Sequence, residues 1–356
     1  MDSLNNVRSP DPRTTHQTWI LRARLTAQLL AGPAARPVDV ARRLLAIQAQ
    51  DLRGARLAIR ARTEGLSAAD VDHAMTVDRS LVISWLNRGT LHLVRADDYP
   101  WLHALTSPPT LTATLRRLAQ EHVTPDAADR GVALIERALT DEGALTREQL
   151  RDRLDAAGIR TEGQALVHIL ALASLRGVMV RGPMIAGQHA FVLVHDWLGT
   201  SRSVERDAAL AELARRYLAG HGPADERDLA AWSGLPLRDA RAGLAAIGSE
   251  LVQASDGLVD LARRSPAGPL PPPRLLGPYD PVLHGWRSRD LVLGEHRYVV
   301  TVNGLFRAFA MVRGRAVGTW KLERGAVQLA PFAPLSPAVA RALAADAEEV
   351  RRFFGT

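Results

Sequence analysis

Cysteine is absent from this 356-residue chain, and lysine is almost absent. Without cysteine the protein has no disulfide scaffold, no thiolate zinc site, no iron–sulfur cluster and no cysteine nucleophile. Lys321 is the only lysine, so 44 of the 45 basic residues are arginines, whose charge does not titrate at cellular pH. A high-GC coding bias explains arginine in place of lysine, but it does not explain where the charge lies.

Long apolar runs are also missing. Residues 1–17 contain none, so we expect no signal peptide there and a disordered segment. The most apolar stretch, 165–180, includes His168 and Arg176 and is too short to span a bilayer. We therefore expect a soluble, cytoplasmic protein with no membrane partner.

Several common catalytic motifs are absent: GxGxxG, GxxxxGK[ST], HExxH and GxSxG. The eleven histidines form no i, i+4 pair, so we predict no metal site and no cofactor. His168, within an apolar helical run, is interpreted as a core residue. His92, expected on a strand beside a turn, is a candidate site residue.

Charge is distributed unevenly along the chain. Residues 1–125 carry 16 basic and 11 acidic side chains and residues 269–356 carry 12 and 7, a net charge of +5 for each segment. The segments between them, 126–200 and 201–268, have net charges of −2 and −1. Either a polyanion is held between the two basic ends, or the ends are two unrelated solvated faces. The charge sums leave both interpretations open.

Helical and strand patterns recur in one order, three helices followed by a strand pair, which is typical of a winged helix. We predict an α+β fold with three tandem winged-helix units, an antiparallel C-terminal β region and a terminal helix. The expected divisions are a disordered segment 1–17, units at 18–125, 126–200 and 201–264, and the C-terminal region with its basic hairpin and terminal helix at 265–356.

Strands are expected in the C-terminal region at 297–302, 305–312, 316–322 and 326–329, with hairpin turns at 303–304 and 313–315. Basic side chains surround the second turn, whose apex is Gly314; they are Arg307, Arg313, Arg315 and Lys321. Such a hairpin either contacts DNA phosphates or a groove, or is a solvated turn in an arginine-rich protein. Arg88, in a turn at 87–89, is a further candidate DNA contact.

Two glutamines, Gln48 and Gln50, follow the apolar face of a helix expected over 37–47. On a regular helix, residues i and i+2 point about 200° apart, so both amides cannot face one pocket. They converge only if the helix ends near residue 47 and the next residues are extended. The residues alone favour a solvated C-terminal helix turn. Asp51 is expected to cap a helix or to pair with an arginine, Arg53 or Arg56.

Several segments resemble the AlkZ/YcaQ-type winged-helix DNA glycosylases: LLAIQAQDLRGARLAIRART, LNRGTLHLVRADDYPWL, LLGPYDPVLHG and NGLFRAFAMVRGRAVGTWKL. The resemblance covers nearly the whole chain from about residue 18. Gln50 places the chain with the AlkZ branch, which has a catalytic Gln-x-Gln motif, because the YcaQ branch has aspartate there. The resemblance implies that Gln48 and Gln50 are catalytic, that residues 309–320 form a DNA-contacting hairpin, and that the protein gives self-resistance to a DNA-alkylating natural product.

The implied reaction is hydrolysis of the N-glycosidic bond of bulky or cross-linked N7-alkylguanine in duplex DNA. Alkylation at N7 makes the guanine cationic, so the leaving base needs no protonation. Neutral amides can then orient a water and face the oxocarbenium-like sugar. No lysine lies near the motif to form a Schiff base, so we expect a monofunctional enzyme that leaves an abasic site. The expected partner is lesion-containing duplex DNA, and a monomer suffices.

Two other functions fit the same patterns. A non-catalytic winged-helix DNA-binding regulator needs only the helices and the basic hairpin. A scaffold would use the same units to bind proteins. Product formation separates a glycosylase from both, and salt-dependent DNA binding separates the regulator from the scaffold.

Overall fold

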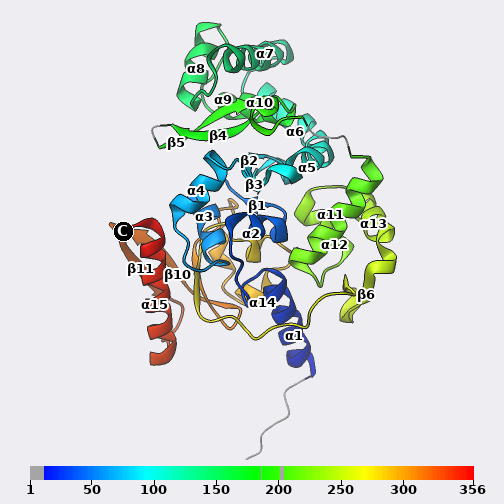
Figure 1. Cartoon of the computed structure of the whole chain (residues 1–356), viewed down its shortest axis with the longest axis vertical. Helices are drawn as coiled ribbons and strands as arrows, with labels where there is room; N and C mark the ends of the chain where they lie inside the picture. The colour runs from blue at the N-terminus through cyan, green and yellow to red at the C-terminus, as the bar shows by residue number, and fades with distance from the viewer. Residues whose placement is uncertain (1–11, 186, 201–203) are drawn as a thin grey trace, which may run out of the picture.

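The structure is a computed structural model and describes residues 12–185, 187–200 and 204–356. Helices and antiparallel sheets occur together, and the chain ends in strands followed by a helix, as predicted (Figure 1). The helices are α1 (Pro12–Ala27), α2 (Pro37–Leu44), α3 (Leu52–Arg60), α4 (Ala68–Thr76), α5 (Tyr99–Thr106), α6 (Pro108–Gln120), α7 (Pro125–Glu142), α8 (Arg147–Ala156), α9 (Ala165–Leu175), α10 (Val194–Leu198), α11 (Arg206–His221), α12 (Glu226–Ser233), α13 (Leu237–Ala246), α14 (Asp290–Leu293) and α15 (Pro337–Phe354). The strands are β1 (Ile47–Gln48), β2 (Leu81–Trp85), β3 (Leu91–Arg95), β4 (Met179–Ile185), β5 (Gln188–Leu193), β6 (Leu251–Gln253), β7 (Val259–Leu261), β8 (Arg274–Leu276), β9 (Phe309–Val312), β10 (Arg315–Glu323) and β11 (Ala326–Pro331).

Helix α1 begins at Pro12, although the sequence predicts disorder through residue 17 and a helix from Trp19. The prediction is wrong for residues 12–17. Proline is favoured in the first turn of a helix, because its missing N–H has no intrahelical partner there. The rest of the predicted disordered segment, 1–11, lies outside the described residues.

Local capping signals determine where two helices of the N-terminal region begin. Ser67 accepts a hydrogen bond from the N–H of Asp70, and the Asp70 carboxylate accepts one from the N–H of Ser67. This capping box at the start of α4 confirms the predicted N-cap. Asp51 caps α3 in a similar way, by accepting from the N–H of Gly54.

The central sheet has five antiparallel strands in the order β1-β3-β2-β4-β5. The first three belong to the first predicted unit and the other two to the second, and the groups join where Ile83 pairs with Arg181. One hydrophobic cluster crosses the predicted boundary, from Val40 in α2 to Leu172 in α9. Joining the hairpins covers strand edges that two separate units would expose. The division into three winged-helix units stays a prediction.

Helices α11 to α13 and the hairpin of β6 and β7 follow in the order predicted for the third unit. Helix α11 packs closely against α2: a Cβ on Gly220 would lie 2.4 Å from the carbonyl oxygen of Arg43. Only glycine permits this approach. Aromatic rings fill the buried side of α11, with centroids 4.9–6.0 Å apart: Tyr217, His221, Trp232 and Trp286.

The C-terminal sheet has the strand order β11-β10-β9-β8. The prediction of a strand at 297–302 is wrong. Residues Arg297–Val299 form a short 3-10 helix, and the only pairing that follows within the predicted strand is an isolated β-bridge between Val300 and Phe306. Val299 packs with residues of α1 and α14 instead of joining a ladder. Strand β8, which follows a proline-rich stretch, has no periodicity to predict it and pairs with β9.

The C-terminal region returns onto the N-terminal region through a fully buried ion pair. Arg62, just after α3, binds Asp280 through two hydrogen bonds of 2.8 and 2.9 Å, and both side chains are 0% exposed. The remaining donors of Arg62 reach Gln28 and the carbonyl of Ala58. Three segments far apart in sequence therefore share one hydrogen-bond network.

Figure 1 shows the resulting arrangement, in which α2 and α3 lie between the C-terminal sheet with α15 on one side and α11 to α13 on the other. Helices α7 and α8 lie at the end opposite α1. Among the described residues no helix is long and apolar enough to cross a membrane.

We expect Asp280→Ala to lower the free energy of unfolding by about 3–5 kcal/mol, because it leaves the buried Arg62 without its carboxylate. Urea unfolding followed by circular dichroism measures this. Asp129→Ala, which breaks an exposed pair with Arg176, is the control and should change stability by less than about 1 kcal/mol. Equal effects of the two substitutions would contradict the assigned role of Asp280.

Stability should also depend on the protonation of His221, which is fully buried. Burial lowers the pKa of His221 to about 3, below the ordinary value of 6.5. The unfolded chain therefore binds a proton that the folded chain does not, and stability is lost as pH falls from 6.5 towards 3. The loss should be about 1.4 kcal/mol for each pH unit. In urea unfolding at pH values from about 7.5 down to about 4.5, His221→Phe should show a shallower pH dependence than the parent. Parallel curves of unfolding free energy against pH for the variant and the parent would show that His221 does not contribute to the pH dependence.

Candidate active site

The two glutamines of the motif lie in an extended segment between α2 and α3. Helix α2 ends earlier than predicted, and Gln48 pairs with His92 across strands β1 and β3. The N–H of Ala49 donates to the carbonyl of Leu91 at 2.7 Å, which extends the pairing. Side chains two apart on an extended chain project from the same side. The Nε2 of Gln48 accordingly lies 2.7 Å from the Oε1 of Gln50.

Burial distinguishes the two amides. Gln48 is only 7% exposed, whereas Gln50 is exposed and Ala49 between them points into the core. The solvated helix turn favoured by the residues alone is therefore wrong, because the helix ends before the motif. Of the roles expected for Asp51, the structure shows the cap of α3. Arg56 does not pair with Asp51, because it forms an ion pair with Asp72 at 2.6 Å.

Arg88 is the third polar member of the site. It lies in the 3-10 turn Asn87–Gly89 with φ 57° and ψ 15°, an unusual conformation for a residue other than glycine. Its Nη2 donates to Gln48 Oε1 at 3.2 Å, and its Nη1 donates to the carbonyl of Trp232. Burial, with a smaller contribution from the charge of Arg289, lowers the pKa of Arg88 to about 10. Arg88 is thus a partly buried cation beside the glutamines.

Two neutral histidines lie beside this cation. Burial lowers the pKa of His92 to about 3, with a smaller contribution from Arg88, while Nδ1 of the ring lies 3.0 Å from the carbonyl of Thr90. Burial also holds the pKa of His284 well below its ordinary value, with contributions from Arg88 and Arg289. Neither ring carries the extra proton of an imidazolium at neutral pH.

The C-terminal region contributes an aromatic wall to the site. The ring of His284 lies 4.1 Å from that of Phe306 and 6.0 Å from that of Tyr279, and the guanidinium of Arg289 lies 5.1 Å from the Phe306 ring. Burial raises the pKa of Tyr279, and the neighbouring charge of Asp51 raises it further. Tyr279, His284 and Phe306 lie in segments that resemble the family, but sequence reasoning did not identify them as site residues. They follow the glutamines by more than 200 positions, and no local pattern links them to the motif.

An exposed apolar loop adjoins this wall. Val300 and Phe306 form an isolated bridge, and the turn between them carries Val302, fully exposed at 103%, and Leu305, 58% exposed. Exposed apolar side chains at the edge of a polar site are typical of an interaction surface. The turn at 303–304 was predicted, but as the connection of a longer hairpin. We call residues 300–306 the apolar loop.

The turn of the predicted basic hairpin, residues 313–315, packs against helix α1. Gly314 is buried at the turn, and a Cβ there would lie 2.7 Å from Leu25 and 2.8 Å from Leu21 of α1. The apex of the turn therefore packs on a helix instead of projecting freely into solvent. Contact of the hairpin with a groove or with phosphates stays a prediction. The turn has Arg313 and Arg315, both exposed, on either side.

The four predicted DNA contacts of the C-terminal region fall into two groups. Lys321 lies six residues along β10 from Arg315, a separation of about 20 Å in an extended strand. It is paired with Glu323 at 2.6 Å. Arg307, at the same end of the sheet as Lys321, is exposed and directly follows Phe306. DNA contact by these residues, and by Arg88, stays a prediction.

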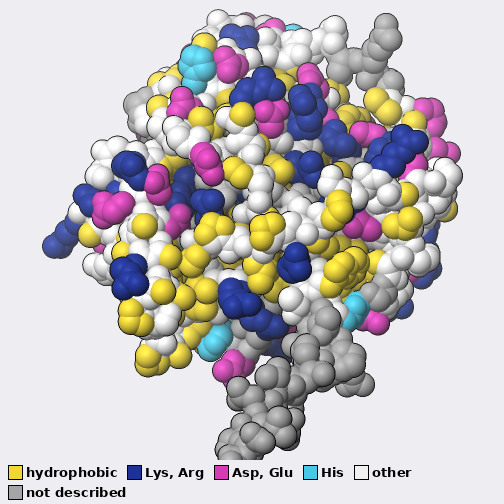
Figure 2. Space-filling view, turned by 60° about the horizontal axis from the view of Figure 1, so that its bottom comes forward, with side chains coloured by type: hydrophobic (Ala, Val, Ile, Leu, Met, Phe, Trp, Pro, Cys, Tyr) yellow, Lys and Arg dark blue, Asp and Glu magenta, His cyan; other side chains and the backbone are white. Residues whose placement is uncertain are grey.

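Charge is mixed on the face shown in Figure 2, where Lys and Arg side chains are interspersed with Asp and Glu and hydrophobic side chains lie across the middle. Within the described ranges, no group of three His, Cys, Asp or Glu residues is arranged to hold a metal ion.

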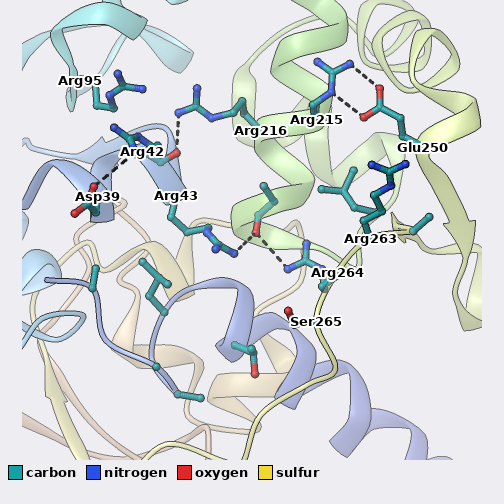
Figure 3. A pocket seen from close by; sticks show the side chains of 18 of the residues that line it. Asp39, Arg42, Arg43, Arg95, Arg215, Arg216, Glu250, Arg263, Arg264 and Ser265 are labelled. Atoms are coloured by element: carbon teal, nitrogen blue, oxygen red, sulfur yellow. Dashed lines mark hydrogen bonds and ion pairs between the residues drawn. The ribbon is translucent and has the colours of Figure 1, made fainter. Parts of the chain in front are cut away.

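An arginine-rich cavity of about 1160 Å³ lies elsewhere, between α2, α11 and the segment after β7. Figure 3 shows two of its arginines, Arg43 and Arg264, converging on one carbonyl, that of Ala219 near the end of α11. Carboxylates bind other arginines of the cavity: Arg215 pairs with Glu250. These contacts join three regions of the fold, and none of the glutamine-site residues lines the cavity.

Comparisons with known proteins show which family the chain belongs to. A model of the family described as DNA glycosylase AlkZ-like matches residues 41–353. The chain is 27% identical over 342 residues to an interstrand DNA cross-link repair glycosylase of Streptomyces sahachiroi, covering 89% of this chain and 90% of the relative. It matches the solved structure of Streptomyces sahachiroi DNA glycosylase AlkZ with a TM-score of 0.77 at 23% identity, over 95% of this chain and 96% of that chain. Since the family match covers most of the sequence, the chain belongs to the AlkZ-like DNA glycosylases and is a DNA glycosylase.

Proposed function

We propose that this DNA glycosylase hydrolyses the N-glycosidic bond of bulky or cross-linked N7-alkylguanine in duplex DNA and leaves an abasic site. The observation that carries the proposal is the amide pair: Gln48 is buried and holds Gln50, whose amide is exposed beside a cation and two neutral histidines.

The substrate class follows from what the site can supply. An unmodified purine leaves readily only when it is protonated, which requires a general acid. His92 and His284 are unprotonated at neutral pH, so neither can act as that acid. N7-alkylguanine already carries a positive charge and departs as a neutral base. Gln50 then needs only to position a water against the deoxyribose as positive charge develops there.

The surroundings of Gln50 suit a large lesion. Its amide is exposed, and the apolar loop adjoins the wall formed by His284 and Phe306. A bulky or cross-linked base cannot easily rotate into a closed pocket, so an open site that accepts the lesion near the duplex is required. The name of the relative as a cross-link repair glycosylase supports this substrate class. We infer a role in self-resistance to a DNA-alkylating natural product.

We expect Gln50→Ala to reduce excision about 100-fold, because the water loses its positioning group, with duplex binding largely intact. Gln48→Ala should have a similar effect through Gln50. Purified protein is incubated with duplex DNA carrying a bulky N7-alkylguanine, hydroxide is added, and strand cleavage at the lesion is measured against spontaneous depurination. Gln253→Ala, at an exposed glutamine on β6, is the matched control. Binding without cleavage by the parent would instead indicate a DNA-binding regulator.

We expect the double variant Val302→Ser, Leu305→Ser to bind lesion-containing duplex about tenfold more weakly, because apolar side chains at an exposed tip contact or wedge into base steps. The slope of log affinity against log salt should not change, since no phosphate contact is lost. Arg307→Ala provides the contrast and should reduce that slope by about one. Binding is measured by fluorescence anisotropy over a salt series. Unchanged affinity of the double variant would show that the apolar loop does not contact DNA.

A further inference from the structure

The hydrogen bonds of the glutamine pair have only one possible direction. The guanidinium of Arg88 can donate but cannot accept, so the end of Gln48 that faces it must be the carbonyl oxygen, Oε1. The opposite end of Gln48, Nε2, must then donate to Gln50 Oε1. This order removes the usual ambiguity between the oxygen and nitrogen ends of an amide.

The direction of these hydrogen bonds, from Arg88 through Gln48 to Gln50, determines which amide groups the two glutamines present to DNA. Gln48 is 7% exposed, and each end of its amide already makes one hydrogen bond within the protein, so it presents much less of its amide to DNA than Gln50 does. Gln50 keeps both Nε2 hydrogens and one lone pair of Oε1 free on an exposed side chain. In a chain of hydrogen bonds each donor polarises the next. The charge of Arg88 therefore strengthens Gln50 as a donor.

We propose that Arg88 is a positioning residue: acting through Gln48, it orients Gln50 so that the amide N–H of Gln50 donates to an acceptor atom of the departing purine while Gln50 Oε1 accepts a hydrogen bond from the attacking water. The inference rests on the proposed glycosylase function and deepens it. As the C1′–N9 bond breaks, its electron pair moves onto the purine and neutralises the N7 charge. The water oxygen bonds to C1′, and a water proton passes to solvent.

Arg88 has no carboxylate partner among the described residues, unlike two arginines that form buried ion pairs. Arg62 and Arg60 are buried against carboxylates, those of Asp280 and Asp346. The ion pairs of the described residues give Arg88 no carboxylate, and its identified acceptors are the amide of Gln48 and a backbone carbonyl. A partly buried cation with neutral partners is destabilising by itself. Its position beside the motif, with a direct bond to Gln48, supports a role in function.

Backbone geometry holds this arginine in place. Its φ of 57° is the left-handed conformation, which is unfavourable for a residue with a side chain. Gly234 packs against it so closely that an added Cβ would lie 2.9 Å from the Arg88 nitrogen. Residues held in rare conformations cluster at functional sites, where the surrounding structure determines them.

The test separates the rate of excision from the affinity for DNA. Single-turnover excision of a bulky N7-alkylguanine is measured at saturating enzyme, together with the dissociation constant of the same duplex. We expect Arg88→Met to lower the rate about 100-fold while the dissociation constant changes by less than about threefold. Arg88→Lys keeps a donor and should recover most of the rate. Arg238→Met, at an exposed arginine on α13, is the matched control and should match the parent.

A second variant covers the case in which Arg88→Met does not fold. Gln48→Glu keeps the acceptor for Arg88 but cannot donate, so Gln50 must turn its N–H inward towards the new carboxylate, and the rate should fall about 100-fold with binding retained. A parent-like rate in either variant would overturn the proposal. A second result with Arg88→Met would also overturn the proposal: an unchanged excision rate at saturating enzyme, together with weaker DNA binding and a reduced slope of log affinity against log salt. That result would make Arg88 a phosphate contact. Failure of the parent protein to excise the lesion would instead refute the proposed function.

Discussion

The buried ion pair between Arg62 and Asp280 holds together the segments that form the site. Both side chains are excluded from water, and the five hydrogen bonds of Arg62 reach Gln28 just after α1, Ala58 in α3 and Asp280 in the C-terminal region. Such a pair is favourable only when every donor and acceptor is satisfied, as here. Asp280 directly follows Tyr279 and lies four residues before His284, so the pair also places the aromatic wall beside the glutamines. The ion pair thereby joins the region that carries the glutamine motif to the region that carries the aromatic wall.

The electrostatics of the site follow from the same packing. Burial keeps His92 and His284 neutral. Arg88 is then the charged group that bonds directly to the glutamine pair, through Gln48. A site of this kind is poorly suited to protonating a leaving group and well suited to orienting neutral dipoles around one that is already charged. The direction of the amide hydrogen bonds is then a consequence of having an arginine at the end of the chain of donors.

Close backbone approach is the second constraint on the assembly. Gly54 lies against Pro278, where a Cβ would be 2.4 Å from the carbonyl oxygen, and Gly277 lies against Leu57. The segment that carries Tyr279 is thus pressed directly onto α3, whose N-cap is Asp51. Helix α3 therefore contacts the ion pair at its end and the motif at its beginning. The central sheet fixes the motif from the other side by pairing β1 with β3.

The sequence by itself determined the local features: the mixed helices and antiparallel strands, the caps at Ser67 and Asp51, and the turn at 313–315. These depend on residues within a few positions of one another, so their signals are visible in sequence. The convergence of Gln48 and Gln50 was not among them, because the residues alone favoured a helix turn there and only the early end of α2 brings the two amides together. Only the tertiary structure decided that the hairpins of two predicted units share a sheet, that Gly314 packs on α1, and that Arg88 turns inward to Gln48. It also brought His284 and Phe306 to the motif. Contacts of this kind join segments tens to hundreds of residues apart, and their energy comes from burial and close packing, which no local pattern encodes.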